Sequence, residues 1–428
     1  MKPDRRQFIQ NAAGGLGALS IGSWLDTATK QSLLGEIRNT LLANPGPEDE
    51  DFWALIRQAY TVSPQIINLN NGGVSPQPAV VQDAMVRFYH QANEGPSYYM
   101  WQVLDQGREP LRRRLAELAG CDPEEVAMNR NASEALETAI YGIDLDKGDE
   151  VVLSKQDYPN MINAWKQREQ REGIVLKWVN HQLPTEDSDL LVKGYTDLFT
   201  SRTRVVHITH IINWNGQVLP ARAIADQARK KNILVVIDGA HSFAHLDYSV
   251  PDLGGDYFGT SLHKWLSAPF GSGFLWVKKE RIAETWPLFA SQEPRSEDIR
   301  KFEALGTRSF PIEHAVGEAI DFQLLIGNRR KQKRLWYLKN YWTSQVQDLP
   351  GVSIGTPVSS DWSGAIALLQ IEGKEPSEIS QALWKDHKIH TVAIVWENIK
   401  GVRITPHVYT SLRDLDLLVK AIRQIAST

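Results

Sequence analysis

Cysteine is nearly absent from this chain of 428 residues, which contains only Cys121. A single thiol cannot form a disulfide within the chain or supply a cysteine-rich zinc site. An excess of charge is absent too, because 47 Lys and Arg residues stand against 51 Asp and Glu residues, for a formal net charge of −4. The sequence therefore lacks the strongly basic surface that marks a nucleic-acid-binding protein.

Internal repeats, low-complexity segments and a convincing membrane span are also missing. The small, mildly apolar run at 12–25 is too short and too rich in Gly and Ala to be a transmembrane helix. It follows Arg5-Arg6 and Phe8, a pattern that resembles a twin-arginine export signal. We therefore expect residues 1–30 to be a signal of this type and the protein to be periplasmic or otherwise exported, with no membrane attachment afterwards. The alternative is a chance Arg pair and a cytoplasmic protein.

What the chain does contain is a regular alternation of strand and helix patterns. Short β-branched runs at 151–153, 174–179, 204–208 and 233–237 alternate with helical patterns at 158–171, 187–199 and 220–231. Such alternation predicts a parallel sheet covered by helices, with ligands at the carboxyl ends of the strands. A further strand is expected at 273–277, one long helix at 313–341, and a smaller α+β domain after about residue 349.

The most informative stretch is Thr-Ser-Leu-His-Lys-Trp-Leu at 260–266. The buried strand before it ends in Asp238, and Lys264 follows some two dozen residues later. A lysine can form a Schiff base with an aldehyde cofactor, and an aspartate can keep a pyridinium nitrogen protonated. Taken alone, a lysine such as Lys264 is far more often a solvated surface residue, and Asp238 is also compatible with a helix cap.

Two polar turns provide further candidate binding groups. A short strand at 126–128 leads into Asn131, Ala132 and Ser133 at the start of a predicted helix. Free N–H groups and the positive end of the helix dipole at such a place attract a phosphate, although Asn131 or Ser133 can also be a simple cap. The glycine turn at 70–73 lets the backbone approach a ligand closely.

Taken together, these motifs resemble the class V aminotransferase family of fold type I pyridoxal-phosphate enzymes. This family includes cysteine desulfurases, selenocysteine lyases and isopenicillin N epimerase-like proteins, and the last of these groups is the closest match. The resemblance covers roughly residues 66 to 425 and implies an α/β fold. Its large domain has a mainly parallel seven-stranded sheet between helices, beside a small C-terminal α+β domain. The expected parts are an N-terminal segment at 31–90 that contributes to the small domain and the site entrance, the large cofactor-binding domain at 91–315 and the small domain at 316–428.

The resemblance also implies a cofactor, pyridoxal 5′-phosphate, and a role for each matching residue. Lys264 would form the Schiff base, Asp238 would pair with the pyridine nitrogen, and Tyr158 would stack on the ring. The Gly306-Thr307 pair would reach the phosphate of a partner subunit, so a homodimer with shared active sites is implied. The expected cofactor-binding residues are Asn131, Ala132, Ser133, Tyr158, Asn213, Asp238, His241, Ser261, His263, Lys264, Gly306 and Thr307.

The implied substrate is an amino acid. Arg403 matches the arginine that clamps a substrate carboxylate, a task that suits a planar guanidinium. We expect Asn71 and Gly72 to join it in substrate binding, and no residue to bind a metal. Trp101, Trp214 and Trp396 could line the pocket, but we expect core packing to be the use of each.

The family resemblance leaves the reaction open. Lys264 and Tyr158 are the expected catalytic residues, and epimerisation or racemisation, transamination and C–S lyase chemistry all begin with loss of the Cα proton. Persulfide-forming desulfurases need a nucleophilic cysteine in the C-terminal part of the chain, whereas the one thiol here, Cys121, lies before the phosphate turn. That chemistry is therefore disfavoured. An alternative of a different class is a protein that has the cofactor fold but binds its ligand without turnover.

Overall fold

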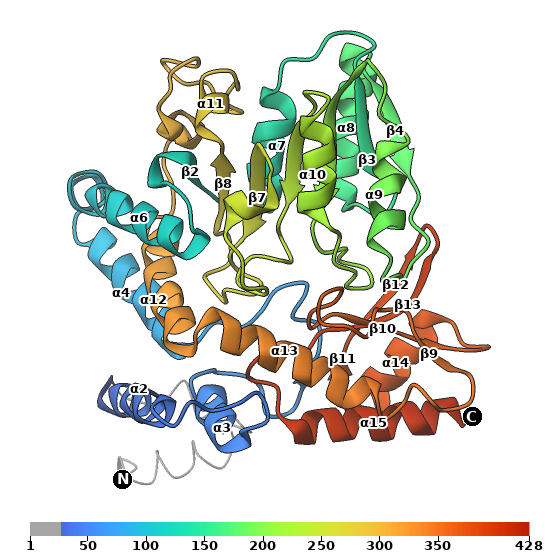
Figure 1. Ribbon diagram of the computed structural model, residues 1–428. Coiled ribbons are helices and arrows are strands. Elements are labelled where there is room, and N and C mark those ends of the chain that lie inside the picture. The colour runs from blue at the N-terminus through green and yellow to red at the C-terminus, as the bar shows by residue number, and fades with distance from the viewer. Residues whose placement is uncertain (1–26, 428) are drawn as a thin grey trace, which may run out of the picture.

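A seven-stranded sheet between two layers of helices forms the larger part of the molecule, as the computed structural model of residues 27–427 shows (Figure 1). Five neighbouring strands run parallel, namely β4 (Val175–Val179), β3 (Glu150–Ser154), β5 (Thr203–Thr209), β6 (Leu234–Asp238) and β7 (Tyr257–Ser261). The strand β8 (Gly273–Val277) is antiparallel to both of its neighbours, β7 and β2 (Val126–Asn129). The mainly parallel seven-stranded sheet predicted from the sequence is thus confirmed. In spatial order the strands are β2, β8, β7, β6, β5, β3 and β4.

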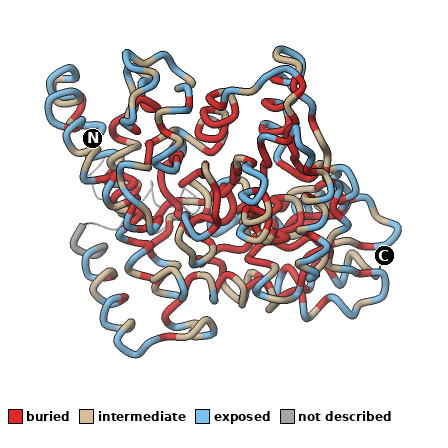
Figure 2. Tube along the Cα trace, turned by 45° about the horizontal axis from the view of Figure 1, so that its top comes forward, coloured by how far each residue is buried: buried red, intermediate tan, exposed pale blue. Residues whose placement is uncertain are grey.

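The central strands are apolar throughout because each of their faces is buried in a different core. In β6, Val235 and Ile237 face one hydrophobic cluster, whereas Val236 faces the other. Successive strand side chains point to opposite faces, so a continuous β-branched run covers both. Buried residues are accordingly concentrated along the sheet in the interior (Figure 2). The helices of the two layers are α6 (Arg108–Ala119), α9 (Ser188–Thr196), α10 (Ala221–Arg229) and α12 (Phe310–Ile326) on one side, and α7 (Ala132–Gly142) and α8 (Pro159–Glu172) on the other.

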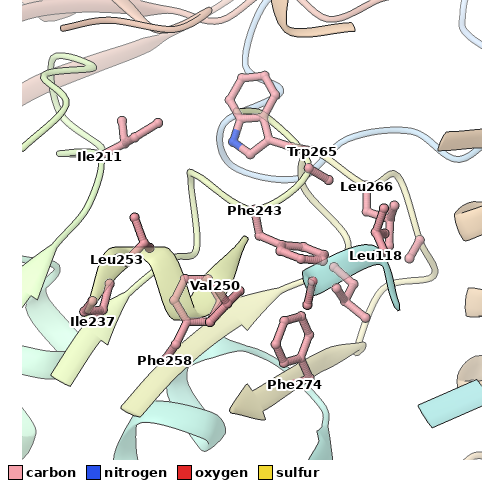
Figure 3. Packing of buried hydrophobic residues seen from close by; sticks show 14 of the residues in the cluster. Leu118, Ile211, Ile237, Phe243, Val250, Leu253, Phe258, Trp265, Leu266 and Phe274 are labelled. Atoms are coloured by element: carbon pink, nitrogen blue, oxygen red, sulfur yellow. The ribbon is translucent and has the colours of Figure 1, made fainter. Parts of the chain in front are cut away.

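The first of these cores extends from the sheet to the loop that carries Lys264. Phe243, Phe258 and Phe274 pack edge to face or tilted, with ring centroids 4.9 to 6.5 Å apart. Trp265 and Leu266 belong to the same cluster, on the other side of these rings from the sheet (Figure 3). Since Trp265 is fully buried, the residue before it in the chain is held by the core rather than by a free loop.

A second, smaller domain carries a four-stranded antiparallel sheet in the order β12 (Val392–Trp396), β13 (Ile399–Ile404), β10 (Ala367–Ile371) and β9 (Val352–Ile354). Helices α14 (Pro376–His387) and α15 (Leu412–Ala426) share its own hydrophobic cluster. The N-terminal segment joins this domain, because β1 (Ile67–Asn68) pairs in parallel with β11 (Ile389–His390).

The single long helix predicted at 313–341 is wrong. The structure has two helices there, α12 and α13 (Asn328–Thr343), separated by Gly327 with φ +87°. A positive φ cannot continue a right-handed helix, and glycine adopts it without steric penalty. The predicted domain boundary between residues 315 and 316 falls inside α12, which packs against α4 (Ala79–Asn93) in the first core.

The remaining described elements lie mostly toward the N-terminus. The predicted export signal at 1–30 falls outside the described residues except for its last four positions, which begin α2, so it stays a prediction. No helix within 27–427 combines the length and the apolar character needed to cross a membrane. The helices and helical turns not yet named are α2 (Thr27–Leu41), α3 (Glu50–Gln58), α5 (Pro96–Tyr98), a π-helical turn (Tyr99–Leu104), α11 (Lys279–Ile282) and 3-10 turns at Asp105–Gly107, Pro123–Glu125, Val250–Leu253 and Ile299–Glu303.

Candidate active site

A cavity of about 470 Å³ lies at the carboxyl ends of β5, β6 and β7, where the small domain meets the sheet. Those strands deliver Thr209, Asp238 and Ser261 as their last residues, and β13 contributes Arg403 from the opposite domain. A cavity at this edge agrees with the general rule for open α/β sheets. The predicted site residues that line it are Gly72, Asn131, Ala132, Ser133, Tyr158, Asn213, Asp238, His241, Ser261, His263, Lys264 and Arg403.

Three predicted site residues do not line this cavity. Asn71 is fully buried behind it, where its Nδ2 donates to the carbonyl of Thr405 at 2.7 Å and its Oδ1 accepts from the Tyr409 hydroxyl at 2.6 Å. Asn71 therefore anchors the glycine turn rather than facing a ligand. Gly306 and Thr307 lie on an exposed loop away from the cavity of their own chain.

Lys264 is half-buried and lines the cavity with its amine close to His241. Its Nζ lies 3.1 Å from Nε2 of His241. Burial lowers the pKa of the amine, the carboxyl of Asp238 raises it and the guanidinium of Arg403 lowers it, with a pKa of about 8 as the result. Burial holds the pKa of His241 far below its usual range, so this imidazole is neutral and its Nε2 can accept from Lys264.

Asp238 lines the cavity as a buried carboxyl, and none of the residues in the described range 27–427 forms an ion pair with it by direct contact. Its Oδ1 accepts the N–H of Ala240 at 2.9 Å. Burial raises its pKa, and the Ala240 N–H and the charge of Lys264 offset that effect only in part. A protonated ring nitrogen placed beside this carboxyl would reverse the shift, because an opposite charge favours the ionised form.

The start of α7 forms the anion-binding end of the cavity. Asn131 caps the helix by accepting the N–H of Glu134 at 2.9 Å, and Ser261 Oγ accepts the N–H of Ala132 at 2.9 Å. The Ser261 hydroxyl keeps its own proton available as a donor. Ser133 Oγ accepts from Asn160 at 3.2 Å and also lines the cavity. Hydroxyl donors at a helix N-terminus suit a phosphate group.

Arg403 forms the other end, on β13. Its Nη1 donates to the carbonyl of Asn213 at 2.9 Å and its Nη2 donates to Oδ1 of Asn70 at 3.0 Å. Its Nε is buried and has no hydrogen-bond partner in the part of the chain that the structure describes. Burial lowers the pKa of Arg403 to about 10, against an opposing effect of Tyr158, so the guanidinium remains charged at neutral pH. A Cβ atom on Gly72 would lie 3.6 Å from Arg403 Cζ, in van der Waals contact, so the glycine leaves that side of the guanidinium uncovered.

Several contributors to the site were not identified from the sequence. Asp157 is fully buried, and its two carboxyl oxygens accept from Thr209 Oγ1 at 2.7 Å and from the N–H of Ser154 at 2.8 Å. The pKa of Asp157 is raised to about 7. Burial and the nearby charge of Asp238 raise it, whereas the hydrogen bonds from Thr209 and Ser154 lower it in part. Thr209 follows the strand-end rule, which gives a signal in the sequence. Val392 and Ile394 belong to an alternating strand pattern, and they can be assigned to the cavity only once the position of that strand is known.

Trp101, Trp214 and Trp396 have different positions. Trp214 lines the cavity, and Trp396 stacks behind it with centroids 5.1 Å apart. Trp101 is 54% exposed on the π-helical turn, away from the cavity of its own chain. Core packing, the expected use of all three, therefore does not describe Trp101.

Comparison with known proteins identifies the family. The chain matches the aminotransferase class-V description over residues 67–416, most of its length. The chain belongs to the class V aminotransferase family. Among curated relatives, the isopenicillin N epimerase of Streptomyces clavuligerus is 29% identical over 394 residues, which cover 86% of this chain and 97% of that protein. A cysteine desulfurase of Haloferax volcanii is 25% identical over 409 residues, which cover 89% and 92% of the two chains.

Solved structures agree on the fold. A cysteine desulfurase from Thermococcus onnurineus superposes with a TM-score of 0.77 at 21% identity, covering 87% of this chain and 97% of that one. A cystine C-S lyase in complex with its product cysteine persulfide gives a TM-score of 0.75 at 22% identity, covering 83% and 97%. At this level of identity the likeness establishes the fold type I architecture and nothing more specific.

Family membership makes the chain a pyridoxal-phosphate-dependent enzyme, and the cavity fits that cofactor. Among the residues described, Asn213 Oδ1, His241 Nδ1 and His263 Nδ1 are buried polar atoms without a hydrogen-bond partner, and all three residues line the cavity. Buried polar atoms are normally paired, so these three indicate a polar ligand. The phosphate fits the α7 end with Ser261 and His263, and the ring nitrogen fits Asp238.

Proposed function

We propose that this enzyme removes the Cα proton of an amino acid with the Lys264 amine, in an epimerase, racemase or aminotransferase reaction. The observation that carries the proposal is the position of that amine. It is half-buried at the cavity, 3.1 Å from a neutral His241 imidazole, and the charges of both Asp238 and Arg403 affect its pKa. A pKa of about 8 lets the amine give up and take back a proton near neutral pH.

The other residues bind and orient. Bound pyridoxal phosphate supplies an electron sink that stabilises negative charge at Cα. Asp238 holds the proton on the pyridine nitrogen on which that role depends, and Ser261, His263 and the α7 N-terminus hold the phosphate. Arg403 accepts the substrate carboxylate in its planar fork, since its Nε is still free to donate.

The identity of the second proton donor separates the candidate reactions. Tyr158 lines the cavity, is 40% exposed and lies close enough to Arg403 to affect the pKa of that guanidinium. Return of a proton to Cα by Tyr158 would give the opposite enantiomer. Transamination would instead need Lys264 to deliver the proton to the cofactor carbon. In the family, Tyr158 matches the residue that stacks on the ring.

A C–S lyase is the second candidate, because curated relatives include cysteine desulfurases. Elimination at Cβ needs only the Lys264 amine and a sulfur leaving group. Persulfide transfer through Cys121 is disfavoured, since this thiol does not line the cavity. Burial, with help from Glu125 and Asp122, also raises the pKa of its thiol to about 12. A thiol is a poor nucleophile when it is not ionised.

The test is a visible absorption spectrum of the holoprotein during addition of single amino acids, followed by product analysis. We expect a cofactor band that shifts with its substrate, and Lys264→Ala to lose turnover by at least about a thousandfold, as removal of a catalytic base does. Opposite enantiomer, keto acid, or pyruvate with ammonia and sulfide would assign the reaction. Full turnover by Lys264→Ala would refute the role of Lys264, and a shifting band without any product would identify a binding protein.

We propose further that the enzyme works as a homodimer with shared active sites. Gly306 and Thr307 match the family's pair that reaches a partner's phosphate, and both are exposed in the single chain. A partner surface is supported by large apolar side chains that a monomer would leave in water. They are Tyr89 at 61% exposure, Tyr98 at 61%, Trp101 at 54% and Phe270 at 55%.

A further inference from the structure

The charged side chains around the cavity are few, and the proposed function uses each of them. Among the described residues that line it, the carboxyl of Asp238, the amine of Lys264 and the guanidinium of Arg403 are the groups whose ordinary state at neutral pH is charged. His263 is neutral because burial lowers its pKa to about 4. The cofactor would engage Asp238 and Lys264, and the substrate carboxylate would engage Arg403. A charged substrate side chain would then be buried without a partner, which is strongly unfavourable.

The wall next to Arg403 is apolar. Val392 lies directly opposite Arg403 in the antiparallel pair of β12 and β13, so both side chains point to the same face. Ile394 is two residues further along β12 and therefore also faces that side. Both line the cavity, and the wall continues away from the guanidinium along the strand.

The large domain supplies the facing surface through Trp214. The carbonyl of Asn213 accepts from Arg403 Nη1, and the next residue, Trp214, lines the same cavity as Arg403. Trp396, again two residues along β12, stacks on Trp214 with an interplanar angle of 22°. Trp396 Nε1 donates to the carbonyl of Lys155 at 2.9 Å, which ties this hairpin to the large domain. Trp214 is thus held by Trp396 and lines the cavity, and its Nε1 is buried without a hydrogen-bond partner among the described residues.

From these contacts we infer that the substrate is an α-amino acid with an uncharged, apolar side chain, which lies against Val392, Ile394 and Trp214. This inference rests on the proposed function, because it takes Arg403 as the carboxylate-binding group. It goes beyond that function by naming the side-chain class. Leucine, methionine and phenylalanine are the appropriate probes, and aspartate, glutamate and lysine are the probes of the opposite class.

Spectral titration of the holoprotein tests the inference through dissociation constants, independently of turnover. We expect the apolar probes to bind about tenfold or more tightly than the charged ones, the effect of burying a few methylene groups. Equal or tighter binding of the charged probes would overturn the inference while the proposed function stood. If no amino acid of either class changed the spectrum, both the proposed function and this inference would fail.

A matched pair of variants locates the side-chain site. Val392→Thr keeps the shape of the side chain but makes the wall polar, and should weaken the apolar probes about three- to tenfold without affecting alanine, the range expected for one lost apolar contact. Val395→Thr makes the same change on the opposite face of β12, where the side chain is 71% exposed, and should change nothing. Unchanged binding in Val392→Thr, or equal losses in both variants, would place the side chain elsewhere.

Discussion

At the scale of single residues, the site depends on how three charges share one buried space. Burial alone would lower the pKa of the Lys264 amine and raise that of the Asp238 carboxyl, and each partly corrects the other. Arg403 adds a positive charge that lowers the lysine pKa further. The pKa of this amine is therefore about 8 instead of the ordinary 10.5 of a lysine, so the neutral, nucleophilic form appears at a pH about 2.5 units lower.

This balance predicts how the apoprotein captures its cofactor as the pH changes. Because the pKa of Lys264 is lowered, its neutral form grows as pH rises through about 8, and the rate of combination with pyridoxal phosphate should rise with it. Replacing Arg403 by Gln removes a charge that lowers this pKa, so the rise should move to higher pH. The cofactor is removed and added back, and stopped-flow absorbance measures the rate of recombination against pH for the wild type and for Arg403→Gln. Identical midpoints of the two pH profiles would contradict the electrostatic role of Arg403.

Single residues also show how far the sequence could predict the site. Asp238 could be identified because it ends a recognisable strand, and Lys264 and Ser261 because they belong to the Ser-Leu-His-Lys motif that resembles the family pattern. Asp157 and Val392 could not, since the role of each depends on contacts formed by residues distant in the chain: Asp157 through Thr209, and Val392 through its pairing with Arg403. Asn71 was misplaced because a glycine turn has two sides, and the sequence does not say which of them faces the ligand.

At the scale of elements, one buried carboxylate joins three pieces of the large domain. Glu303 ends the 3-10 turn Ile299–Glu303 and accepts from Arg112 and Arg108 of α6 at 2.6 Å, and from the N–H of Met128 of β2 at 2.6 Å. Burial acts to raise the pKa of Glu303, but the hydrogen bonds and charges of Arg112 and Arg108 lower it overall. The carboxylate thus stays ionised and fixes the start of the loop that carries Gly306 and Thr307.

Replacing Glu303 by Gln should therefore destabilise the protein by about 3–5 kcal/mol, the usual cost of removing one partner from a buried ion pair. The control is Glu318→Gln, which breaks a surface pair with Arg87 and should change stability by less than about 1 kcal/mol. Urea unfolding measures both variants. Equal, small effects would show that Arg112 and Arg108 find other partners.

Elements also differ in how well the sequence predicts them. The strands β3, β4, β5, β6 and β8 were predictable because each is a largely apolar run between polar turns, whereas β7 was not predicted because its sequence, Tyr-Phe-Gly-Thr-Ser, is not an apolar run. The break between α12 and α13 was missed because the apolar and basic pattern continues through Gly327, and an isolated glycine is tolerated within a helix. Only the packing of α12 on α4 and the sharing of the small-domain core by α13 make two helices necessary.

At the scale of the whole molecule, one chain supplies most of an active site but leaves Gly306 and Thr307 outside it. Their loop starts at the fixed carboxylate of Glu303, so it is held in place although its tip is exposed. In the proposed homodimer, each tip would complete the phosphate site of the other subunit. The dimer would also cover the exposed aromatic side chains at 89, 98 and 101.

Shared sites predict that two inactive variants restore activity when mixed. Thr307→Asp should weaken cofactor binding at the partner's site by charge repulsion with the phosphate, and Lys264→Ala inactivates its own site. In a mixed dimer, the intact Lys264 of one chain meets the intact Thr307 of the other, so one of the two sites is complete. Unfolding and refolding the variants together should give about a quarter of wild-type activity, since about half of the dimers formed at random are mixed and each has one working site. Activity that stays at the level of the separate variants would mean that each chain builds its site alone.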